Sequence, residues 1–244
     1  MILILMNSNF PILCGFNECS EAGKDHFVPV IFLSRCNLRC PYCMNSDLIF
    51  PHFSSKISID EIHNKVKNLG SEMVLISGGE PTCTELTQLK SLIDEIWSWG
   101  VKVGMATNGT NHNAIQYLIP YLSFVVMDLK VVYEVAPQYL DSLFDPMTEM
   151  IRSKTILTQE KRLRENFDYE LRTTLYPPYV KKKDIRNIGG IIRQDERWIL
   201  QQFRITPNML DKNSQLIKPY SPAKLNGLLA KAKEYTQFAE LRWV

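Results

Sequence analysis

The chain has 244 residues, of which 45% are apolar and 22% are charged, and this composition is typical of a globular protein with a sizeable core. Its formal net charge of +2 argues against a nucleic-acid-binding protein that relies on bulk electrostatics. The apolar run at residues 1–6 is too short for a signal peptide core, and no other stretch approaches the roughly 18 apolar residues of a membrane-spanning helix. We therefore expect a cytoplasmic protein with no membrane or nucleic-acid partner.

Strand and helix patterns alternate along the chain. Apolar runs predict strands at residues 2–5, 27–33, 73–76, 101–106, 123–127 and 198–205, and polar–apolar alternation predicts another at 168–175. Apolar residues at helical spacing predict helices at residues 58–69, 86–97, 111–119, 133–164 with a break near 145, 185–192 and 221–232. Residues 10–27 and 206–220 are expected to be irregular, and a closing strand is expected at 238–243.

Two of these helices carry clear start signals. Ser58 and Glu61 match a capping box, and Gly70 is suited to end the helix that they begin. Ser221 followed by Pro222 is also typical of a helix start.

The alternation of strands and helices predicts one parallel α/β sheet with right-handed crossovers. Functional groups should then lie at the carboxyl ends of the strands. Polar motifs follow four predicted strands, at residues 36–43, 78–81, 107–109 and 128–130. We therefore expect these motifs to share one site at one rim of the sheet.

The cysteines are confined to the first third of the chain, whereas a disulfide framework would spread them along it; they are Cys14, Cys19, Cys36, Cys40, Cys43 and Cys83. In a large protein without a targeting segment, clustered cysteines favour a metal site. Cys14, Cys19 and Cys83 are too few to hold a second cubane cluster without other ligands, and we interpret them as buried or incidental thiols.

Cys36, Cys40 and Cys43 lie on one loop at spacings of four and three residues. Thiolates are soft ligands, and three of them can hold an iron–sulfur cluster or a zinc ion. A cubane cluster with four irons would keep one iron without a protein ligand, and an open metal position is where a metal site does chemistry. Zinc would need a fourth ligand, and none stands at finger-like spacing.

Gly78, Gly79, Glu80 and Pro81 end the next predicted strand. Two glycines allow a sharp turn and a close approach of a ligand to the backbone. Glu80 then presents a carboxylate that can accept hydrogen bonds from an ammonium group. Without the cysteines, the motif would indicate only a strand-ending turn.

The order Cys-x-x-x-Cys-x-x-Cys and then Gly-Gly-Glu-Pro resembles the radical S-adenosylmethionine (SAM) superfamily over about residues 26–205. The resemblance implies an α/β fold in a single domain, a partial (β/α)6 TIM-like barrel of parallel strands. It also implies an N-terminal extension at residues 1–25, a radical SAM core at 26–205, and a C-terminal loop, helix and strand at 206–244.

The resemblance further implies a [4Fe–4S] cluster ligated by the three cysteines of the loop. Its unique iron would bind the amino and carboxylate groups of SAM, and Glu80 with the backbone of Gly78 and Gly79 would hold the methionine ammonium. One electron would cleave SAM to a 5′-deoxyadenosyl radical that abstracts a hydrogen atom. An electron donor of the flavodoxin or ferredoxin type is implied with it.

Other positions resemble glycyl-radical-enzyme activases. Asp128 and Lys130 match an Asp-x-Lys beside bound SAM, Thr107 and Asn108 match a Thr-Asn-Gly that reaches its ribose or carboxylate, and Arg172 matches an arginine near the adenosyl group. The alternative interpretations are a salt bridge between Asp128 and Lys130 and another between Arg172 and Glu170.

Two further features line the expected site. Tyr42 most simply shields the cluster, although an adenine could also stack on it. The sequence Gln-Gln-Phe-Arg at residues 201–204 resembles activase-like proteins of anaerobic ribonucleotide reductases, but it indicates no role beyond lining the site.

The resemblance favours an activase that takes a hydrogen atom from a backbone glycine of a glycyl radical enzyme, such as an anaerobic ribonucleoside-triphosphate reductase. The chain departs from that pattern at residues 17–23, where the family usually has Asp-Tyr-Pro-Gly, and at Met44, where it tends to have His. The alternatives are a radical SAM enzyme acting on a small molecule, similar to 7-carboxy-7-deazaguanine synthase, and a non-enzymatic zinc-binding module.

Overall fold

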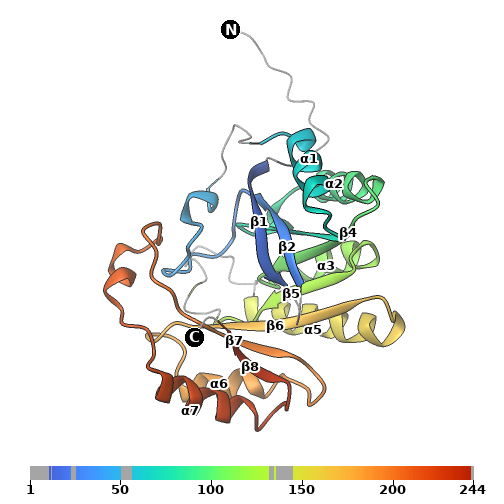
Figure 1. Cartoon of the computed structure of the whole chain (residues 1–244). Coiled ribbons are helices and arrows are strands. Elements are labelled where there is room, and N and C mark those ends of the chain that lie inside the picture. Colours follow the sequence, from blue (N-terminus) through green and yellow to red (C-terminus); the bar gives the residue numbers. More distant parts are fainter. Residues whose placement is uncertain are drawn as a thin grey trace.

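The computed structural model describes residues 11, 13–22, 26–50, 57–131, 135 and 145–242. Helices cover one face of a single sheet, and long loops gather at one end of its strands (Figure 1). In this part of the chain the sheet has eight strands in sequence order, from β1 at one edge to β8 at the other. The two edges do not pair with each other, so the sheet is a partial and open barrel.

The strands are β1 (Leu13–Ala22), β2 (His26–Leu33), β3 (Met73–Gly78), β4 (Lys102–Thr107), β5 (Phe124–Asp128), β6 (Asp168–Leu175), β7 (Trp198–Gln202) and β8 (Ala239–Arg242). The α-helices are α1 (Ile59–Leu69), α2 (Leu86–Ser98), α3 (His112–Leu118), α5 (Pro146–Leu163), α6 (Lys182–Gly189) and α7 (Pro222–Ala232). Short 3-10 helices are η1 (Ser46–Leu48), η2 (Pro81–Cys83), η3 (Ile119–Tyr121) and η4 (Lys212–Leu216).

The predicted parallel α/β sheet is confirmed. Strands β2 to β8 pair in parallel, each with the next, and each crossover carries helical structure where the chain is described. The six strands expected for the barrel are β2 to β7, and the closing strand continues the same sheet as β8. The carboxyl ends of these strands therefore lie at one rim, as the motifs require.

The prediction of irregular structure at residues 10–27 was wrong, because β1 spans Leu13–Ala22 and pairs antiparallel with β2. The register shifts twice along this pair, between Leu13 and Gly15 and between Asn17 and Ser20. Each shift breaks the two-residue alternation that reveals a strand in sequence. Backbone pairing to β2 holds this edge strand, and residues 2–5, where another strand was predicted, lie outside the described residues.

Several element ends also differ from the predictions. Strand β7 ends at Gln202 rather than 205, because its partners end beside it, with Leu175 of β6 opposite Gln202 and Arg242 of β8 opposite Gln201. Helix α6 begins earlier than residue 185, where the Asp184 carboxylate accepts a hydrogen bond from the Lys181 backbone N–H. The loop at 206–220 contains η4, and residues 133–134 and 136–144 of the predicted 133–164 helix lie outside the described residues.

The capping signals are confirmed. Ser58 Oγ accepts from the Glu61 N–H at 3.1 Å, Glu61 Oε2 accepts from the Ser58 N–H at 2.9 Å, and Gly70 ends α1 in the left-handed conformation at φ 60°. Ser221 caps α7, with Pro222 at its first position.

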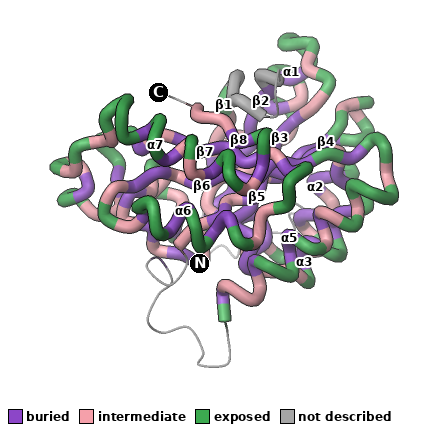
Figure 2. The backbone as a smooth tube through the Cα atoms, turned by 90° about the horizontal axis from the view of Figure 1, so that it is seen from below, coloured by how far each residue is buried: buried purple, intermediate pink, exposed green. Residues whose placement is uncertain are grey.

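The main core lies between the helices and the outer face of the sheet. It joins fully buried strand residues such as Ile31, Val103 and Trp198 to helix residues such as Ile93 and Ile185. A smaller apolar cluster lines the other, concave face; it comprises Val28, Val30, Leu75, Phe124 and Val126. Buried residues follow the strands and exposed residues follow the outer helical surface (Figure 2).

Among the described residues, no helix combines the length and apolar character needed to span a membrane.

Candidate active site

The cysteine loop leaves β2 at Ser34 and is held by its own backbone. Arg35 adopts φ 76°, and its N–H donates to the Leu48 carbonyl at 2.7 Å, while the Cys36 N–H donates to the Ile49 carbonyl at 3.1 Å. These two bonds tie the start of the loop to its end. The three thiols are therefore carried by a closed loop. This loop follows the carboxyl end of β2 (Figure 1).

The three thiols are buried or half-buried and lie close enough to affect one another. Burial raises the pKa of Cys36 and of Cys40 to about 11 each, and it raises the pKa of Cys43. The charge of Lys130 lowers the pKa of each thiol in part. The Leu38 N–H also donates to Cys36 Sγ at 3.4 Å. Thiols in this environment stay protonated until a metal replaces the protons.

This donor set fits a cubane cluster. Within the described ranges, no three or more His, Cys, Asp and Glu side chains converge as they would around a single metal ion. The thiolates of a cubane each bind a different iron and need not converge on one point. Three soft donors on one loop, beside the cation Lys130, therefore suit an anionic iron–sulfur cluster and give no support to the zinc alternative.

Gly78 and Gly79 are required by the cysteine loop itself. A Cβ at Gly78 would lie 2.2 Å from the Leu33 carbonyl oxygen, and one at Gly79 would lie 2.0 Å from the Arg35 carbonyl oxygen. The Gly79 N–H donates to Leu33 O at 2.9 Å, and the Glu80 N–H donates to Arg35 O at 2.7 Å. In the structure, the two glycines allow the backbone of Leu33 and Arg35 to approach closely, and not only a ligand.

Glu80 is 1% exposed and accepts hydrogen bonds at both carboxylate oxygens. Oε1 accepts from the Thr82 N–H, the Thr82 hydroxyl and the Thr107 hydroxyl at 3.1, 2.7 and 2.7 Å, and Oε2 accepts from the Asn108 N–H at 2.6 Å. Burial raises the pKa of Glu80, and these hydrogen bonds oppose that rise. A carboxylate can accept about four hydrogen bonds or more, so Oε2 keeps acceptor capacity for a ligand.

A neutral network joins the loop after β4 to the cysteine loop. The Asn108 amide donates to Asn37 Oδ1 at 2.8 Å, and the Asn37 amide donates to the Thr110 hydroxyl at 2.7 Å. Thr110 in turn donates from its backbone and its hydroxyl to Asn108 Oδ1, at 3.0 and 2.7 Å. The predicted residues Thr107 and Asn108 thus meet Glu80 and the cysteine loop at one place.

Asp128 and Lys130 form the ion pair that was considered as an alternative, with 2.5 Å between Asp128 Oδ2 and Lys130 Nζ. Burial alone would lower the pKa of Lys130, but Asp128, Cys40 and Tyr42 outweigh it and raise that pKa well above its ordinary value. Lys130 is therefore a cation beside the cysteine loop, and the pair does lie at the predicted rim.

Tyr42 is buried beneath the cysteine loop. Its ring centroid lies 4.7 Å from that of Tyr176, which in turn lies 5.0 Å from that of Phe203. The same cluster contains Leu38 and Cys40. This packing agrees with the interpretation of Tyr42 as a shield on one side of the thiols.

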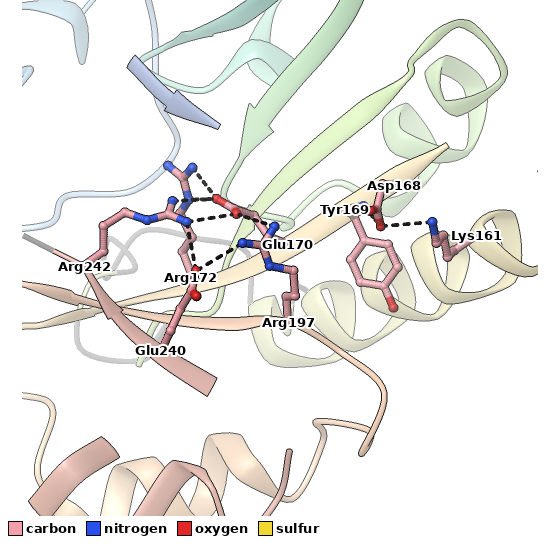
Figure 3. Close-up of polar contacts among 8 residues, drawn as sticks. All are labelled: Lys161, Asp168, Tyr169, Glu170, Arg172, Arg197, Glu240 and Arg242. Atoms are coloured by element: carbon pink, nitrogen blue, oxygen red, sulfur yellow. Dashed lines mark hydrogen bonds and ion pairs between the residues drawn. The ribbon is translucent and has the colours of Figure 1, made fainter. Parts of the chain in front are cut away.

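Arg172 lies in a group of charged residues around β6 and β8 (Figure 3). We call this group the arginine cluster and define it as Arg172, Arg197, Arg242, Glu170 and Glu240. Glu170 is fully buried and pairs with Arg172, with Arg242 at 3.0 Å and with Arg197 at 4.0 Å. Glu240 pairs with Arg197 at 3.1 Å and with Arg242 at 3.3 Å. The predicted alternative of an Arg172–Glu170 pair is present, and burial lowers the pKa of Arg172.

Sequence reasoning missed several residues of the site and of the arginine cluster, namely Asn37, Thr82, Thr110, Arg197, Glu240 and Arg242. The first three stand within or directly beside a motif, so proximity in sequence could have found them. Arg242 is 72 residues from Glu170, and no local pattern joins the two. Cys83 was expected to be incidental, yet its pKa is raised to about 12 by burial and by the charges of Glu80 and Cys36, so it lies beside the site.

Comparisons with known proteins agree with this geometry. The model of the radical SAM superfamily matches residues 30–178. A Methanocaldococcus jannaschii protein proposed to be a glycyl-radical enzyme activating enzyme is 30% identical over 180 residues, which are 71% of this chain and 72% of that protein. The 7-carboxy-7-deazaguanine synthase of Haemophilus influenzae is 31% identical over 117 residues, 47% of this chain and 52% of the enzyme.

Two further similarities extend the range of relatives. The GTP 3′,8-cyclase of Synechocystis is 31% identical over 181 residues, 70% of this chain and 51% of the cyclase. The solved structure of TYW1 with a lysine–pyruvate adduct shares the fold, with a TM-score of 0.53 and 15% identity over 86% of this chain and 74% of that one. The chain belongs to the radical SAM superfamily, whose enzymes use a [4Fe–4S] cluster and S-adenosylmethionine.

Proposed function

We propose that this radical SAM enzyme activates a glycyl radical enzyme by abstracting a hydrogen atom from a backbone glycine of that partner. The proposal is supported chiefly by the relative proposed to be an activating enzyme, which is matched over 71% of this chain. The Asp-Leu-Lys and Gln-Gln-Phe-Arg sequences at residues 128–130 and 201–204 agree with it.

In this proposal Cys36, Cys40 and Cys43 ligate three irons of the cluster. When bound, the cluster would supply the one electron that cleaves SAM to the hydrogen-abstracting 5′-deoxyadenosyl radical. Cys40 is buried, Cys36 and Cys43 are half-buried, and the buried Tyr42 packs in the same cluster as Cys40, where it would keep water from one side of the loop. Lys130 supplies a positive charge that favours the thiolate form of all three ligands.

The residues around Glu80 would hold and orient SAM. Glu80 is fixed by four hydrogen bonds from Thr82, Thr107 and Asn108, so its free acceptor capacity has one orientation for the methionine ammonium. Gly78 and Gly79 would contribute backbone groups beside it. The hydrogen bond from the Asn108 amide to Asn37 holds the Asn108 side chain against the cysteine loop. From there Asn108 would contact the ribose or the carboxylate of SAM.

Glycyl-radical electron paramagnetic resonance tests the activase role. The cluster-loaded protein, a chemical reductant and SAM are mixed anaerobically with an anaerobic ribonucleoside-triphosphate reductase from the same organism, and a glycyl radical is expected on the reductase. The control omits SAM. SAM cleavage without a radical on any glycyl radical enzyme of that organism would disprove the activase role and leave the radical chemistry intact.

A second candidate is a reaction on a small molecule. It is favoured by the similarity to 7-carboxy-7-deazaguanine synthase and to GTP 3′,8-cyclase, although the chain spans about half the length of each. In that case 5′-deoxyadenosine would form in proportion to the small substrate and not to a protein partner. A flavodoxin- or ferredoxin-type electron donor is proposed for either reaction.

A further inference from the structure

Residues 206–217, which we call the outer loop, lie against the cysteine loop. The two loops are bonded to each other at two points. The Asp211 N–H donates to the Pro41 carbonyl at 3.0 Å. The Ser46 hydroxyl donates to the Asn208 carbonyl at 2.6 Å. Because the two bonds lie only a few residues apart in each loop, the two backbones run side by side over this stretch.

Met209 lies between these two contacts in the sequence and is buried beneath them. Its side chain is 1% exposed and belongs to the same apolar cluster as Cys40 and Tyr42. Cys43 and Ile217 are partly buried and pack against that cluster. The outer loop therefore covers one side of the thiols with apolar side chains.

Tyr176, directly after β6, anchors both loops. Its hydroxyl lies 2.9 Å from that of Ser214 in the outer loop, and both residues are buried. Its ring centroid lies 4.7 Å from that of Tyr42 in the cysteine loop. The model of the family matches residues 30–178, so it includes Tyr176 but ends before the outer loop. The outer loop is therefore not among the residues that assign the chain to its family.

Burial beside the thiols bears on the reducing power of the site. One added electron makes a [4Fe–4S] cluster with three thiolate ligands more negative. An apolar environment disfavours the additional charge, whereas water stabilises it. Solvent exposure is accordingly one of the factors that set the reduction potential of such clusters. Apolar side chains that exclude water therefore make the potential more negative and the reduced cluster a stronger reductant.

We propose that the outer loop excludes water from the cluster through Met209, and so holds the reduction potential low. Tyr176 is a positioning residue, because it acts through the outer loop and Tyr42. The role suits the chemistry, since cleavage of SAM takes one electron from the cluster and needs a strong reductant. The proposal rests on the proposed function only in the ligation of the cluster by the three cysteines, and not on the activase role.

The test is a redox titration without SAM and without a partner enzyme. Cluster-loaded protein is titrated anaerobically with sodium dithionite and mediators, and the electron paramagnetic resonance signal of the reduced cluster gives the midpoint potential. Met209→Ser makes room beside the thiols and supplies a hydroxyl, so water can enter. We expect the equilibrium constant for reduction to rise about tenfold, which is a shift of about 59 mV to less negative potential for a one-electron couple.

Two variants are the matched controls. Met209→Leu keeps an apolar side chain at the same place and should leave the potential unchanged. Leu216→Ser also replaces an apolar side chain of the outer loop by a hydroxyl, but Leu216 is 83% exposed, so this variant should leave the potential unchanged as well.

Tyr176→Phe keeps the test decisive if Met209→Ser does not bind a cluster. It removes only the hydroxyl that bonds with Ser214, so it should loosen the outer loop and shift the potential in the same direction by a smaller amount. An unchanged or more negative potential in the variant that carries a cluster would overturn the proposal, as would an equal shift in Leu216→Ser. Neither result depends on whether a glycyl radical forms on a partner, so this proposal and the activase role fail separately.

Discussion

The concave face of the sheet has two parts with different chemistry. Under β2 to β5 it is lined by the apolar cluster that includes Val30, Leu75 and Val126, and the rim above holds one buried carboxylate, Glu80, in a network of neutral donors. Under β6 to β8 the same face carries the arginine cluster. The first part holds the cysteine loop in place, and the second part holds several charged side chains close together.

This difference suggests a division of labour. The first part carries the cysteine loop and the Gly-Gly-Glu-Pro turn and would make the radical, and the charged second part would contact whatever the radical attacks. Relatives that are named for different activities share about 30% identity with this chain. Changes in the first part should therefore abolish chemistry, whereas changes in the second should alter binding and pH dependence.

The largest effect on activity is expected from replacing one of the three cysteines of the loop. Cys40→Ala should abolish the cluster and all SAM cleavage, because two thiolates cannot hold a cubane at an open site. Iron and sulfide content and 5′-deoxyadenosine formation measure the loss. Cys14→Ala is the matched control, since Cys14 is also a buried cysteine but lies on β1, and it should keep both. A Cys40→Ala protein with full iron content would contradict the ligand assignment.

The next largest effect is expected on stability, at the contact between the Gly-Gly-Glu-Pro turn and the cysteine loop. Gly79→Ala forces a Cβ to within 2.0 Å of the Arg35 carbonyl oxygen, so we expect it to lower the free energy of unfolding by about 3 kcal/mol or more. Gly70→Ala is the control, because Gly70 has φ 60° but a Cβ added there would meet no atom within 4 Å, and it should cost about 1–2 kcal/mol. Urea denaturation of the cluster-free protein compares them, and equal losses would show that the two loops are not in close contact.

A smaller effect is expected at Glu80. Glu80→Ala should keep the cluster but weaken SAM binding roughly tenfold to 150-fold, since a hydrogen bond to a charged group contributes about 1.5–3 kcal/mol. Thr82→Val is the comparison: it removes one of the four donors to Glu80 and leaves the carboxylate in place, so its loss of affinity should be smaller. Isothermal titration with SAM measures both. Unchanged SAM affinity in Glu80→Ala would refute the ammonium role.

The same contrast explains what could be predicted from the sequence. The first part of the face is made of local motifs that each end a strand, so the strands, the rim and residues such as Glu80 and Asn108 followed from patterns of a few residues. The internal partners of Glu80 did not follow, because a Gly-Gly-Glu-Pro turn does not reveal that the next strand supplies Thr107 as a donor.

The second part depends on long-range pairing. Glu170 and Arg242 lie 72 residues apart in the sequence. They come together because β6 and β8 flank the same strand, β7, in the sheet. Strand β1 was missed for a related reason, since its hydrogen bonds to β2 define it and its side-chain pattern does not. Alternation within a strand indicates which residues share a face, but it does not identify the strand that will lie opposite.

The smallest effect is the pH dependence of the arginine cluster. Burial raises the pKa of Glu170, but Arg172 and Arg242 outweigh it and hold that pKa below its ordinary value of 4.5. The folded state therefore binds this proton less tightly than the unfolded state. The stabilisation that Glu170 provides is fully present above its unfolded pKa and is lost as the pH falls through the lower, folded pKa.

We expect the difference in unfolding free energy between wild type and Glu170→Gln to shrink as the pH falls from about 5 to about 3, by on the order of 1 kcal/mol for each unit of pKa depression. Glu165→Gln is the control for the substitution itself, because Glu165 is an exposed carboxylate outside the arginine cluster. Urea unfolding at a series of pH values measures both differences. A Glu170 difference that grew on acidification would mean that burial, and not the arginines, dominates the pKa of this carboxylate.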